Sequence, residues 1–527
     1  MMTNKWNSTA LGMLTLVGAL TFSSVAVAQE VTLRSSDGTV NMTGEFVDFR
    51  DNSYVIATAL GELRVSASRV QCEGAACPDL GGGEADVKIG GSDTVGLGLM
   101  PLLLEGYAGS IDAAATLVNT GNGDDVVAEL VGDQGFGDEL ASVLVTSTGS
   151  SDAFSQLLEG NIEIGMSSRR IVPDEARALR SAGGGNMVSP SQEHIVAVDS
   201  LVVITNPSNP VETLTTDQLR QIYSGEVTNW SAVGGPDLAI TVVGRAAESG
   251  TRAVFEGRIF GDAGASDPSG LVVATTNSEA SQIVNQNDGA IGYVGYAFQR
   301  GAKALSLVNE CGIAMAPDAF SARTEEYALQ RRLYLYTRED TASDRTTDFI
   351  NYATSDEADS LIGKAGFIGF AVDRRAQSSD GDRARALLDA AADPYEAGIM
   401  RDMLDLMVGY DRLSTTFRFR TGSSQLDERG RIDKDRLIDY LAAQPAGTQV
   451  MMVGFTDDVG QFDGNLDLSR SRAAQVADEV RDAGGSRLSN VTFASAGYGE
   501  IAPSGCNTSD EGRRINRRVE VWIQSPA

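Results

Sequence analysis

Residues 240–252 have the sequence ITVVGRAAESGTR, which predicts a buried β-strand, a short loop and the start of a helix. Residues 240–243, three of which are apolar, form the expected strand, and the helix is expected over 251–260. Between them, Arg245 precedes the run Ser249-Gly250-Thr251. Hydroxyl groups and glycine-enabled backbone N–H groups at a helix N-terminus favour an anion, because these donors are unpaired and the helix dipole is positive there. The segment therefore predicts an anion site on an α/β scaffold.

Two further segments repeat this order of strand, polar turn and helix. Residues 90–95, GGSDTV, follow the expected strand 86–89 and open a helix over 96–106. Gly149-Ser150-Ser151 precedes a helical stretch over 153–158. Each segment alone could be an ordinary helix cap, since Ser and Thr are common cap residues. Three such helix ends that converge would satisfy a desolvated oxyanion.

Short apolar strands alternate with helical segments over residues 85–370, with further strands expected at 161–164 and 201–204. This alternation is typical of βα units and predicts a largely parallel sheet in a domain of receptor size.

The motifs in this domain, and their order, resemble the periplasmic phosphate-binding receptors of ABC transporters. The resemblance covers about 280 residues and rests on the segments 91–95, 217–225, 228–230, 245–251, 290–293, 332–336 and 366–368. It implies a two-lobed α/β periplasmic-binding-protein fold that closes on inorganic phosphate at a hinge. It also implies these phosphate-binding residues: Thr94, Val95, Ser150 or Ser151, Arg245, Ser249, Gly250 and Thr251.

One position departs from the pattern of the family. Many relatives carry Asp where this chain has Ser168, and a buried carboxylate there accepts the proton that phosphate retains and sulfate lacks. The hydroxyl of Ser168 can also accept a hydrogen bond, with less discrimination. Asp93, Asp152 or Glu248 could supply the carboxylate instead, and the sequence does not distinguish among them.

The C-terminal residues 414–527 predict a compact α+β domain. Strands are expected at 449–455, 491–498 and 519–523, and helices at 434–442 and 468–482. Asp457 follows the first of these strands and Arg472 lies on the second helix. Together they could bind a zwitterion, the carboxylate holding an ammonium group and the guanidinium a carboxylate. The alternative is a surface salt bridge worth about 0–1 kcal/mol.

The neighbouring motifs resemble the OmpA-type peptidoglycan-binding domain. They are TDxxG at 456–460, NxxLSxxRA at 465–473 and NRRVE at 516–520, with 417–419 and 423–426 resembling the first strand and turn of that family. The resemblance implies that Asp457 and Arg472 hold the diaminopimelate side chain of the peptidoglycan stem peptide. Asn465 and Arg517 are expected to shape the pocket.

The N-terminal part indicates export. Residues 1–28 have a short apolar run that ends in Ala-Val-Ala, as in a cleavable secretory signal. Residues 29–80 predict a small β domain, in which Cys72 and Cys77 are expected to form a local disulfide. The spacing of Cys311 and Cys506 allows no prediction of their pairing. Residues 79–83 are expected to be a linker, and 371–413 a helical spacer.

Composition excludes several classes of function. A formal charge of −30 argues against nucleic acid as a partner. With a single histidine and no CxxC pair, the chain offers little for a metal site, a catalytic triad or a histidine base, so we expect no cofactor and no enzymatic activity, phosphatase included. No membrane span is expected in the mature chain.

The leading hypothesis is a periplasmic receptor that captures phosphate for an ABC permease. Its C-terminal domain would hold it to peptidoglycan, near the inner face of the outer membrane. The alternative is a wall-attached envelope scaffold or phosphate sensor without a role in transport.

Overall fold

The computed structural model describes residues 30–526, apart from 36–39, 51–52, 68–69, 75, 79–84, 121–123, 262–263, 265–266, 377–393 and 420–425. The predicted signal 1–28, the linker 79–83 and the turn residues 423–425 lie outside the described residues. Two compact units make up the chain, Met1–Pro78 and Asp79–Ala527, and each is described by itself.

The N-terminal unit is an antiparallel sheet with strand order β4-β3-β2-β1-β5. Its strands are β1 (Glu30–Arg34), β2 (Asn41–Arg50), β3 (Ser53–Thr58), β4 (Gly61–Ser66) and β5 (Gln71–Glu73). Val31, Leu33, Tyr54 and Ile56 are buried within it. A disulfide joins Cys72 to Cys77, the pairing that the five-residue spacing predicts.

The second unit begins with an α/β domain of two lobes that share two long strands, β11 (Glu193–Thr205) and β19 (Gln330–Thr337). The first half of β11 pairs with β19, whereas its last five residues pair with β15 of the second lobe. The main order is β14-β13-β15-β11-β19-β10-β6-β9-β8-β7, and the short strand β16 (Lys303–Ala304) pairs with β11 beside this path. Both connections between the lobes therefore run through one continuous sheet.

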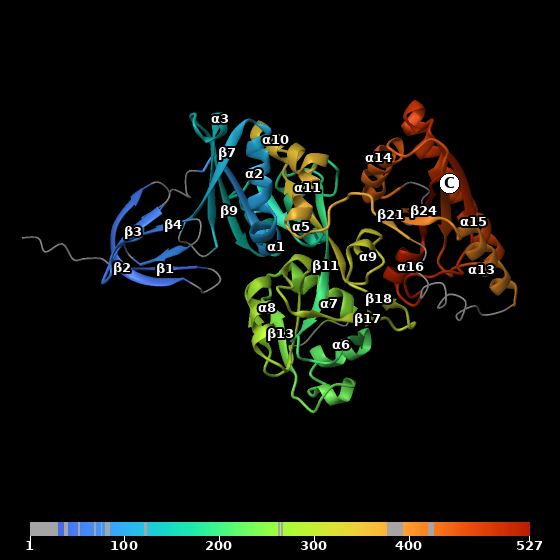
Figure 1. Ribbon diagram of the computed structural model, residues 1–527, viewed down its shortest axis with the longest axis horizontal. Coiled ribbons are helices and arrows are strands. Elements are labelled where there is room, and N and C mark those ends of the chain that lie inside the picture. The colour runs from blue at the N-terminus through green and yellow to red at the C-terminus, as the bar shows by residue number, and fades with distance from the viewer. Residues whose placement is uncertain are drawn as a thin grey trace, which may run out of the picture. The chain divides into compact units, whose positions relative to one another are not determined.

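Lobe 1 contains β6 (Val87–Ser92), β7 (Ala113–Asn119), β8 (Val126–Val131), β9 (Glu139–Thr148) and β10 (Ile164–Ser167). Its helices include α1 (Asp93–Gly98), α2 (Met100–Ser110), α4 (Ser150–Glu159), α5 (Pro173–Ser181), α10 (Asp344–Ala353) and α11 (Asp356–Lys364). Lobe 2 contains β13 (Thr241–Arg245), β14 (Val272–Ala274), β15 (Ala290–Gly295), α6 (Thr216–Tyr223), α7 (Gly250–Ile259) and α8 (Asn277–Gln286). In Figure 1 lobe 1 carries the labels β7, β9, α2, α10 and α11, and lobe 2 carries α6, α7, α8 and β13.

The sheet is mixed, whereas the sequence predicts a largely parallel one. β6 is parallel to β9 and β10, and β13 is parallel to β14 and β15. The shared strands β11 and β19 are antiparallel to their neighbours, and β7, β8 and β9 form an antiparallel meander. The parallel pairs are the ones that place a strand end directly before a helix N-terminus.

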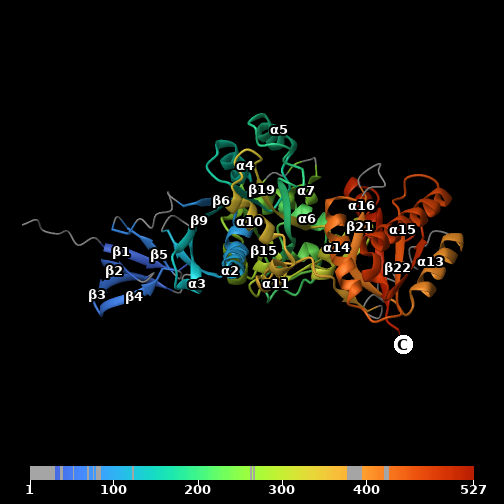
Figure 2. The same ribbon diagram turned by 90° about the horizontal axis from the view of Figure 1, so that it is seen from above.

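The C-terminal domain has a sheet of order β20-β21-β24-β22-β23, formed by β20 (Arg374–Arg375), β21 (Asp411–Arg418), β22 (Thr448–Phe455), β23 (Val491–Gly497) and β24 (Arg518–Gln524). One face packs against α14 (Glu428–Ala442) and α15 (Phe462–Gly484). The opposite face packs against α13 (Pro394–Met407) through Met400, Met403 and Met407 (Figure 2).

The segment 371–413, predicted as a helical spacer, instead takes part in this domain. It supplies β20, the first residues of β21 and the helix α13, whose methionine stripe is buried on the sheet. The amphipathic pattern that suggested a helix is therefore the pattern of a helix packed on a core. Residues 377–393 within the segment lie outside the described part of the chain.

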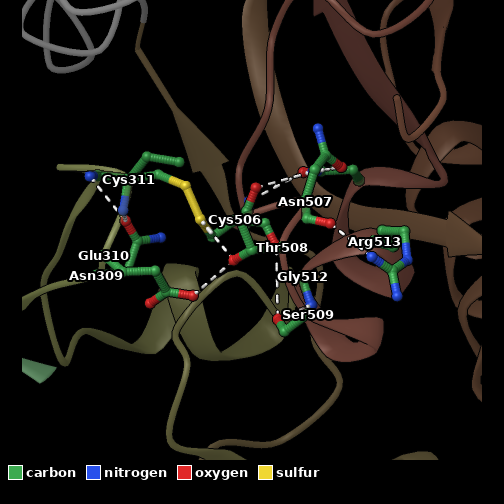
Figure 3. Close-up of a disulfide and its surroundings, with 12 residues drawn as sticks. Asn309, Glu310, Cys311, Cys506, Asn507, Thr508, Ser509, Gly512 and Arg513 are labelled. Atoms are coloured by element: carbon green, nitrogen blue, oxygen red, sulfur yellow. Dashed lines mark hydrogen bonds between the residues drawn. A yellow bond between two sulfur atoms is a disulfide. The ribbon is translucent and has the colours of Figure 1, made fainter. Parts of the chain in front are cut away.

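The C-terminal domain is bonded to the α/β domain. A disulfide joins Cys311 of lobe 2 to Cys506, and the hydroxyl of Thr508 beside it donates to the Glu310 carboxylate at 3.2 Å (Figure 3). Arg514, on α16 (Asp510–Asn516), pairs with the buried Glu325 at 3.0 Å. None of the described helices is long and apolar enough to cross a membrane.

Candidate functional site

Three helix N-termini from the two lobes meet at one buried cluster of hydroxyl groups. Thr94 comes from α1 and Thr251 from α7, and their hydroxyl oxygens are 3.3 Å apart. Ser150, at the start of α4, accepts a hydrogen bond from the backbone N–H of Ser168 at 2.9 Å, and their hydroxyls lie 3.2 Å apart. All four residues are fully buried. The structure thus brings together hydroxyls that the sequence places in separate segments.

Arg245 ends strand β13 beside this cluster, with 1% of its surface exposed. Its Nη2 donates to the Asp93 carboxylate at 2.9 Å and to the Thr275 carbonyl at 2.8 Å, and its Nε donates to the Ala274 carbonyl at 3.2 Å. Its Nη1 is buried and has no hydrogen-bond partner in the described part of the chain. A buried cationic donor without a partner costs free energy, so this amino group is suited to an anionic acceptor.

A second buried arginine, Arg331 on β19, also reaches the cluster. It makes a two-pronged ion pair with Asp199 at 2.9 and 2.6 Å, and its Nη1 donates to the Thr251 hydroxyl at 2.8 Å. Asn277, at the start of α8, donates to both Asp93 and Thr94 at 3.0 Å. Sequence analysis did not single out Arg331, Asp199 or Asn277. The one signal in the sequence for Arg331 and Asp199 was a polar side chain within an otherwise apolar strand. For Asn277 it was a polar side chain at the start of a helix.

The two lobes are in direct contact at this cluster, and Gly250 makes that contact possible. A Cβ atom added at Gly250 would lie 2.1 Å from the Ser150 hydroxyl oxygen and 2.5 Å from that of Ser168. Gly149 of lobe 1 approaches lobe 2 in the same way, since a Cβ there would lie 2.5 Å from the Glu248 carbonyl oxygen. Glycine is required at both positions because a side chain would not fit there. Backbone conformation is not the reason, since neither residue has a positive φ.

The remaining predicted residues have different surroundings. Ser151 accepts from the Arg169 guanidinium at 3.1 Å and is only half-buried, so Ser150 is the serine of α4 that lies in the cluster. The Ser249 hydroxyl caps its own helix by accepting from the backbone N–H of Arg252 at 3.4 Å. Val95 is fully buried in the first turn of α1.

Asp93 is the one of the three candidate acidic residues that lies inside the cluster. Its carboxylate is buried and accepts from both Arg245 and Asn277. Asp152 is half-buried and Glu248 is exposed. The carboxylate that stands beside the cluster is therefore attached to the helix turn of α1 and not to the strand end that carries Ser168.

The second candidate site lies in the C-terminal domain, where β22 leads into α15. Asp457 follows β22, and Asn465 on α15 donates to its backbone carbonyl at 3.3 Å. The ion pair of Asp457 is with Arg517 at 2.6 Å, so the alternative of a salt bridge between Asp457 and Arg472 is not what the structure shows. Arg517 directly follows α16 and reaches the carboxylate from there.

Arg472 lies close to this pair with a different environment. Its guanidinium carbon is 5.0 Å from the ring centre of Phe419, and its Nη1 is buried without a hydrogen-bond partner among the residues that the structure describes. Burial and the charge of Arg517 lower the pKa of Arg472, while Asp457 raises it. Asp457 and Arg472 therefore form an acidic and a basic group whose charges interact without a direct bond.

In the described ranges, no group of histidine, cysteine and acidic residues could hold a metal ion. The polar groups described at both sites are arginines, hydroxyls and carboxylates, which are suited to anions or zwitterions.

Family models match two parts of the chain. Residues 110–357 match a model described as a PBP superfamily domain, and residues 418–517 match the OmpA family. The chain belongs to the PBP superfamily and carries an OmpA-family domain at its C-terminal end. The PBP match lies within the two lobes, and Asp457 lies within the OmpA match.

Relatives of the PBP domain include receptors named for phosphate. The chain is 27% identical over 221 residues to the phosphate-binding protein PstS of Bacillus subtilis, covering 42% of this chain and 68% of that protein. It is 30% identical over 239 residues to the protein SphX of Synechococcus elongatus, covering 42% and 67%. A solved ABC-type phosphate transport receptor from Vibrio cholerae is 27% identical, with coverage of 54% and 99% and a TM-score of 0.40.

Proposed function

We propose that this protein is a non-enzymatic receptor that binds inorganic phosphate between the two lobes of its PBP domain. The observation that carries the proposal is the buried Nη1 of Arg245, which lacks a partner within the described residues and stands beside four buried hydroxyls. Two of these hydroxyls come from α1 and α4 of lobe 1, and a third comes from α7 of lobe 2. An oxyanion placed there would bond both lobes and would favour their closed arrangement.

Phosphate is favoured over sulfate because of Asp93. At neutral pH phosphate retains a proton that a carboxylate can accept, whereas sulfate would face the same carboxylate with no proton to donate. In this proposal Asp93 takes the part that Ser168 cannot take, while Ser150 and Ser168 supply neutral donors. Replacement of Asp93 by Asn should therefore narrow the preference for phosphate over sulfate.

The OmpA domain would attach the receptor to peptidoglycan through the stem peptide. The Nη1 of Arg472 is suited to the carboxylate of diaminopimelate, and Asp457 to its ammonium group. Arg517 would compete for Asp457 and set the position of that carboxylate. The protein would then act in the periplasm, deliver phosphate to an ABC permease, and stay within reach of the wall.

A calorimetric titration of the full-length chain with phosphate and with sulfate tests the receptor half of this proposal. Wild type should release heat with phosphate, and Thr251→Val should bind about 10- to 150-fold more weakly, since a hydrogen bond to a charged group contributes about 1.5–3 kcal/mol. Thr251→Val also removes the acceptor of the Arg331 Nη1, although Arg331 keeps its ion pair with Asp199, so thermal unfolding of the variant without phosphate is measured alongside to separate a loss of folding from a loss of binding. Absence of heat with phosphate in wild type would refute the receptor.

A phosphate sensor without a role in transport is the second candidate. It is favoured by the contacts between the OmpA domain and lobe 2, which are both covalent and ionic. Phosphate uptake by cells that lack the gene distinguishes the receptor from the sensor. Loss of a transport receptor would lower the uptake rate, whereas loss of a sensor would change gene expression and leave the uptake rate of the permease intact.

A further inference from the structure

We call the buried hydroxyls of Thr94, Ser150, Ser168 and Thr251 the oxyanion cluster. A cavity of about 930 Å³ lies next to this cluster and is lined by three parts of the chain. Lobe 1 contributes residues around Arg169 and Ser189, lobe 2 contributes one side of α7, and the OmpA domain contributes Asp427 and Arg514. We call it the arginine chamber, because six arginines line it: Arg169, Arg170, Arg258, Arg331, Arg332 and Arg514.

The wall of the arginine chamber is positive although the chain as a whole is strongly acidic. Its lining includes two carboxylates, Glu193 and Asp427, against six guanidinium groups. Other carboxylates that pair with these arginines, Glu175, Asp199, Glu325 and Glu511, are absent from the lining. The lining itself therefore has six positive and two negative groups, in a chain of formal charge −30.

The arginines are held in place by these carboxylates. Arg170 makes a two-pronged contact with Glu193, with two N–O distances of 2.8 Å. Arg258 and Arg514 both pair with Glu511, at 2.6 and 2.8 Å. A guanidinium has five N–H donors, so one carboxylate leaves donors for a further acceptor, and a fixed guanidinium is suited to two-pronged contacts with phosphate groups.

The chamber adjoins the oxyanion cluster but differs from it in size. Arg331 lines the chamber and donates to Thr251, and Arg169 lines it and donates to Ser151. The oxyanion cluster is so tight that a single methyl group at Gly250 would not fit, whereas the chamber is within the volume range of about 300–1,000 Å³ that is typical of sites for organic ligands. A single orthophosphate cannot contact arginines on all three walls of such a space.

We propose that the arginine chamber is a second anion site, which binds a linear polyanion bearing several phosphate groups. Arg170 of lobe 1, Arg258 of lobe 2 and Arg514 of the OmpA domain would each hold one part of the chain. Because Arg514 and Asp427 form part of the wall, the site depends on the OmpA domain and would be incomplete in a free-standing two-lobed receptor. It goes beyond the proposed capture of orthophosphate and does not require it.

Titration of the full-length protein with tripolyphosphate tests this site. Arg258→Gln should weaken tripolyphosphate binding at least about tenfold while leaving orthophosphate binding unchanged, and Arg170→Gln should do the same from the opposite wall. Arg487→Gln is the matched control, because Arg487 is an exposed, ion-paired arginine outside the chamber. The two wall variants differ in burial, so a folding defect in one leaves the other informative.

Three results would overturn the proposal: no binding of tripolyphosphate, equal affinities in wild type and both wall variants, or citrate binding as tightly as tripolyphosphate, which would indicate a carboxylate site. Ser150→Ala separates this proposal from the receptor function. This substitution should weaken the binding of orthophosphate and leave the binding of tripolyphosphate unchanged. Tripolyphosphate binding by a wild-type chain that gives no heat with orthophosphate would refute the receptor alone.

Discussion

Gly250→Ala is the substitution that tests lobe closure most directly. The added methyl carbon would lie 2.1 Å from the Ser150 hydroxyl oxygen and 2.8 Å from its Cβ, whereas ordinary contact begins near 3.4 Å. The two lobes would have to separate by about 1.3 Å, the difference between 3.4 and 2.1 Å. Rotation of the Ser150 hydroxyl gives no cheap escape, because it accepts from the backbone N–H of Ser168 at 2.9 Å.

Overpacking of this kind costs about 1–3 kcal/mol, and here the cost falls on the closed arrangement of the lobes. We therefore expect phosphate to bind about 5- to 150-fold more weakly to Gly250→Ala than to wild type. The unliganded protein should keep its unfolding temperature, because open lobes have no clash and alanine is a better helix former than glycine. Calorimetric titration with phosphate, together with thermal unfolding with and without phosphate, measures both quantities.

Gly257→Ala provides the matched control in the same helix, α7. Nothing lies within 4 Å of a Cβ at that position. This variant should bind phosphate as wild type does and unfold at a slightly higher temperature, since Gly→Ala in a helix is worth about 0.5–1 kcal/mol. Wild-type phosphate affinity in Gly250→Ala would refute the reasoning, and so would an equal loss of affinity in both variants.

Three further predictions concern the OmpA domain and its attachment. Arg472→Gln should reduce peptidoglycan pull-down at least about tenfold, while the exposed Arg487→Gln should not. Arg514 and Arg258 overcome the effect of burial and lower the pKa of Glu511 from 4.5 to about 2, so its ionised form stabilises the fold above pH 4.5 and this contribution is lost as the pH falls towards 2. The stability difference between wild type and Glu511→Gln, about 1–2 kcal/mol after allowance for partial exposure, should therefore shrink over that window in denaturant titrations. Replacing Cys311 and Cys506 by Ser should destabilise the larger unit by about 2–5 kcal/mol. A reducing agent should have the same effect on the larger unit of wild type but none on that of the variant, whose remaining disulfide, Cys72–Cys77, lies in the other unit.

The sequence was most informative where a site is built from a continuous segment. Arg245 and the run Ser249-Gly250-Thr251 lie at one connection between a strand and a helix. Their order along that connection is set by the local sequence and does not depend on how the rest of the domain folds. The C-terminal motifs were informative for the same reason, since Asp457 follows a strand and Arg472 lies on the next helix. Local pattern therefore placed these side chains at strand ends and helix starts, and their roles in ligand binding stay a prediction.

Sequence analysis failed where position depends on strand crossing. Arg331 and Asp199 meet because β19 and the first half of β11 are paired, and they are 132 residues apart along the chain. Asp457 and Arg517 are separated by 60 residues and meet through the end of α16, so their direct ion pair was not predicted, although Arg517 was expected near the same site. A pairing that is set by tertiary contacts leaves no periodic signal in either segment, and the same holds for Cys311 with Cys506.

The contacts of the OmpA domain differ in strength between the two lobes. Toward lobe 2 it has the disulfide at Cys311 and the ion pair of Arg258 with Glu511. Toward lobe 1, Arg436 lies 3.3 Å from Asp356 and 3.5 Å from the buried Asp359, and Ile432 packs against the core that contains Phe370. These contacts are non-covalent, whereas the disulfide toward lobe 2 cannot break without reduction. Any motion between the lobes would therefore break the contacts with lobe 1 first, and the OmpA domain would stay attached to lobe 2. A receptor held to the wall by its OmpA domain would then have lobe 2 as its fixed half and lobe 1 as the half that opens.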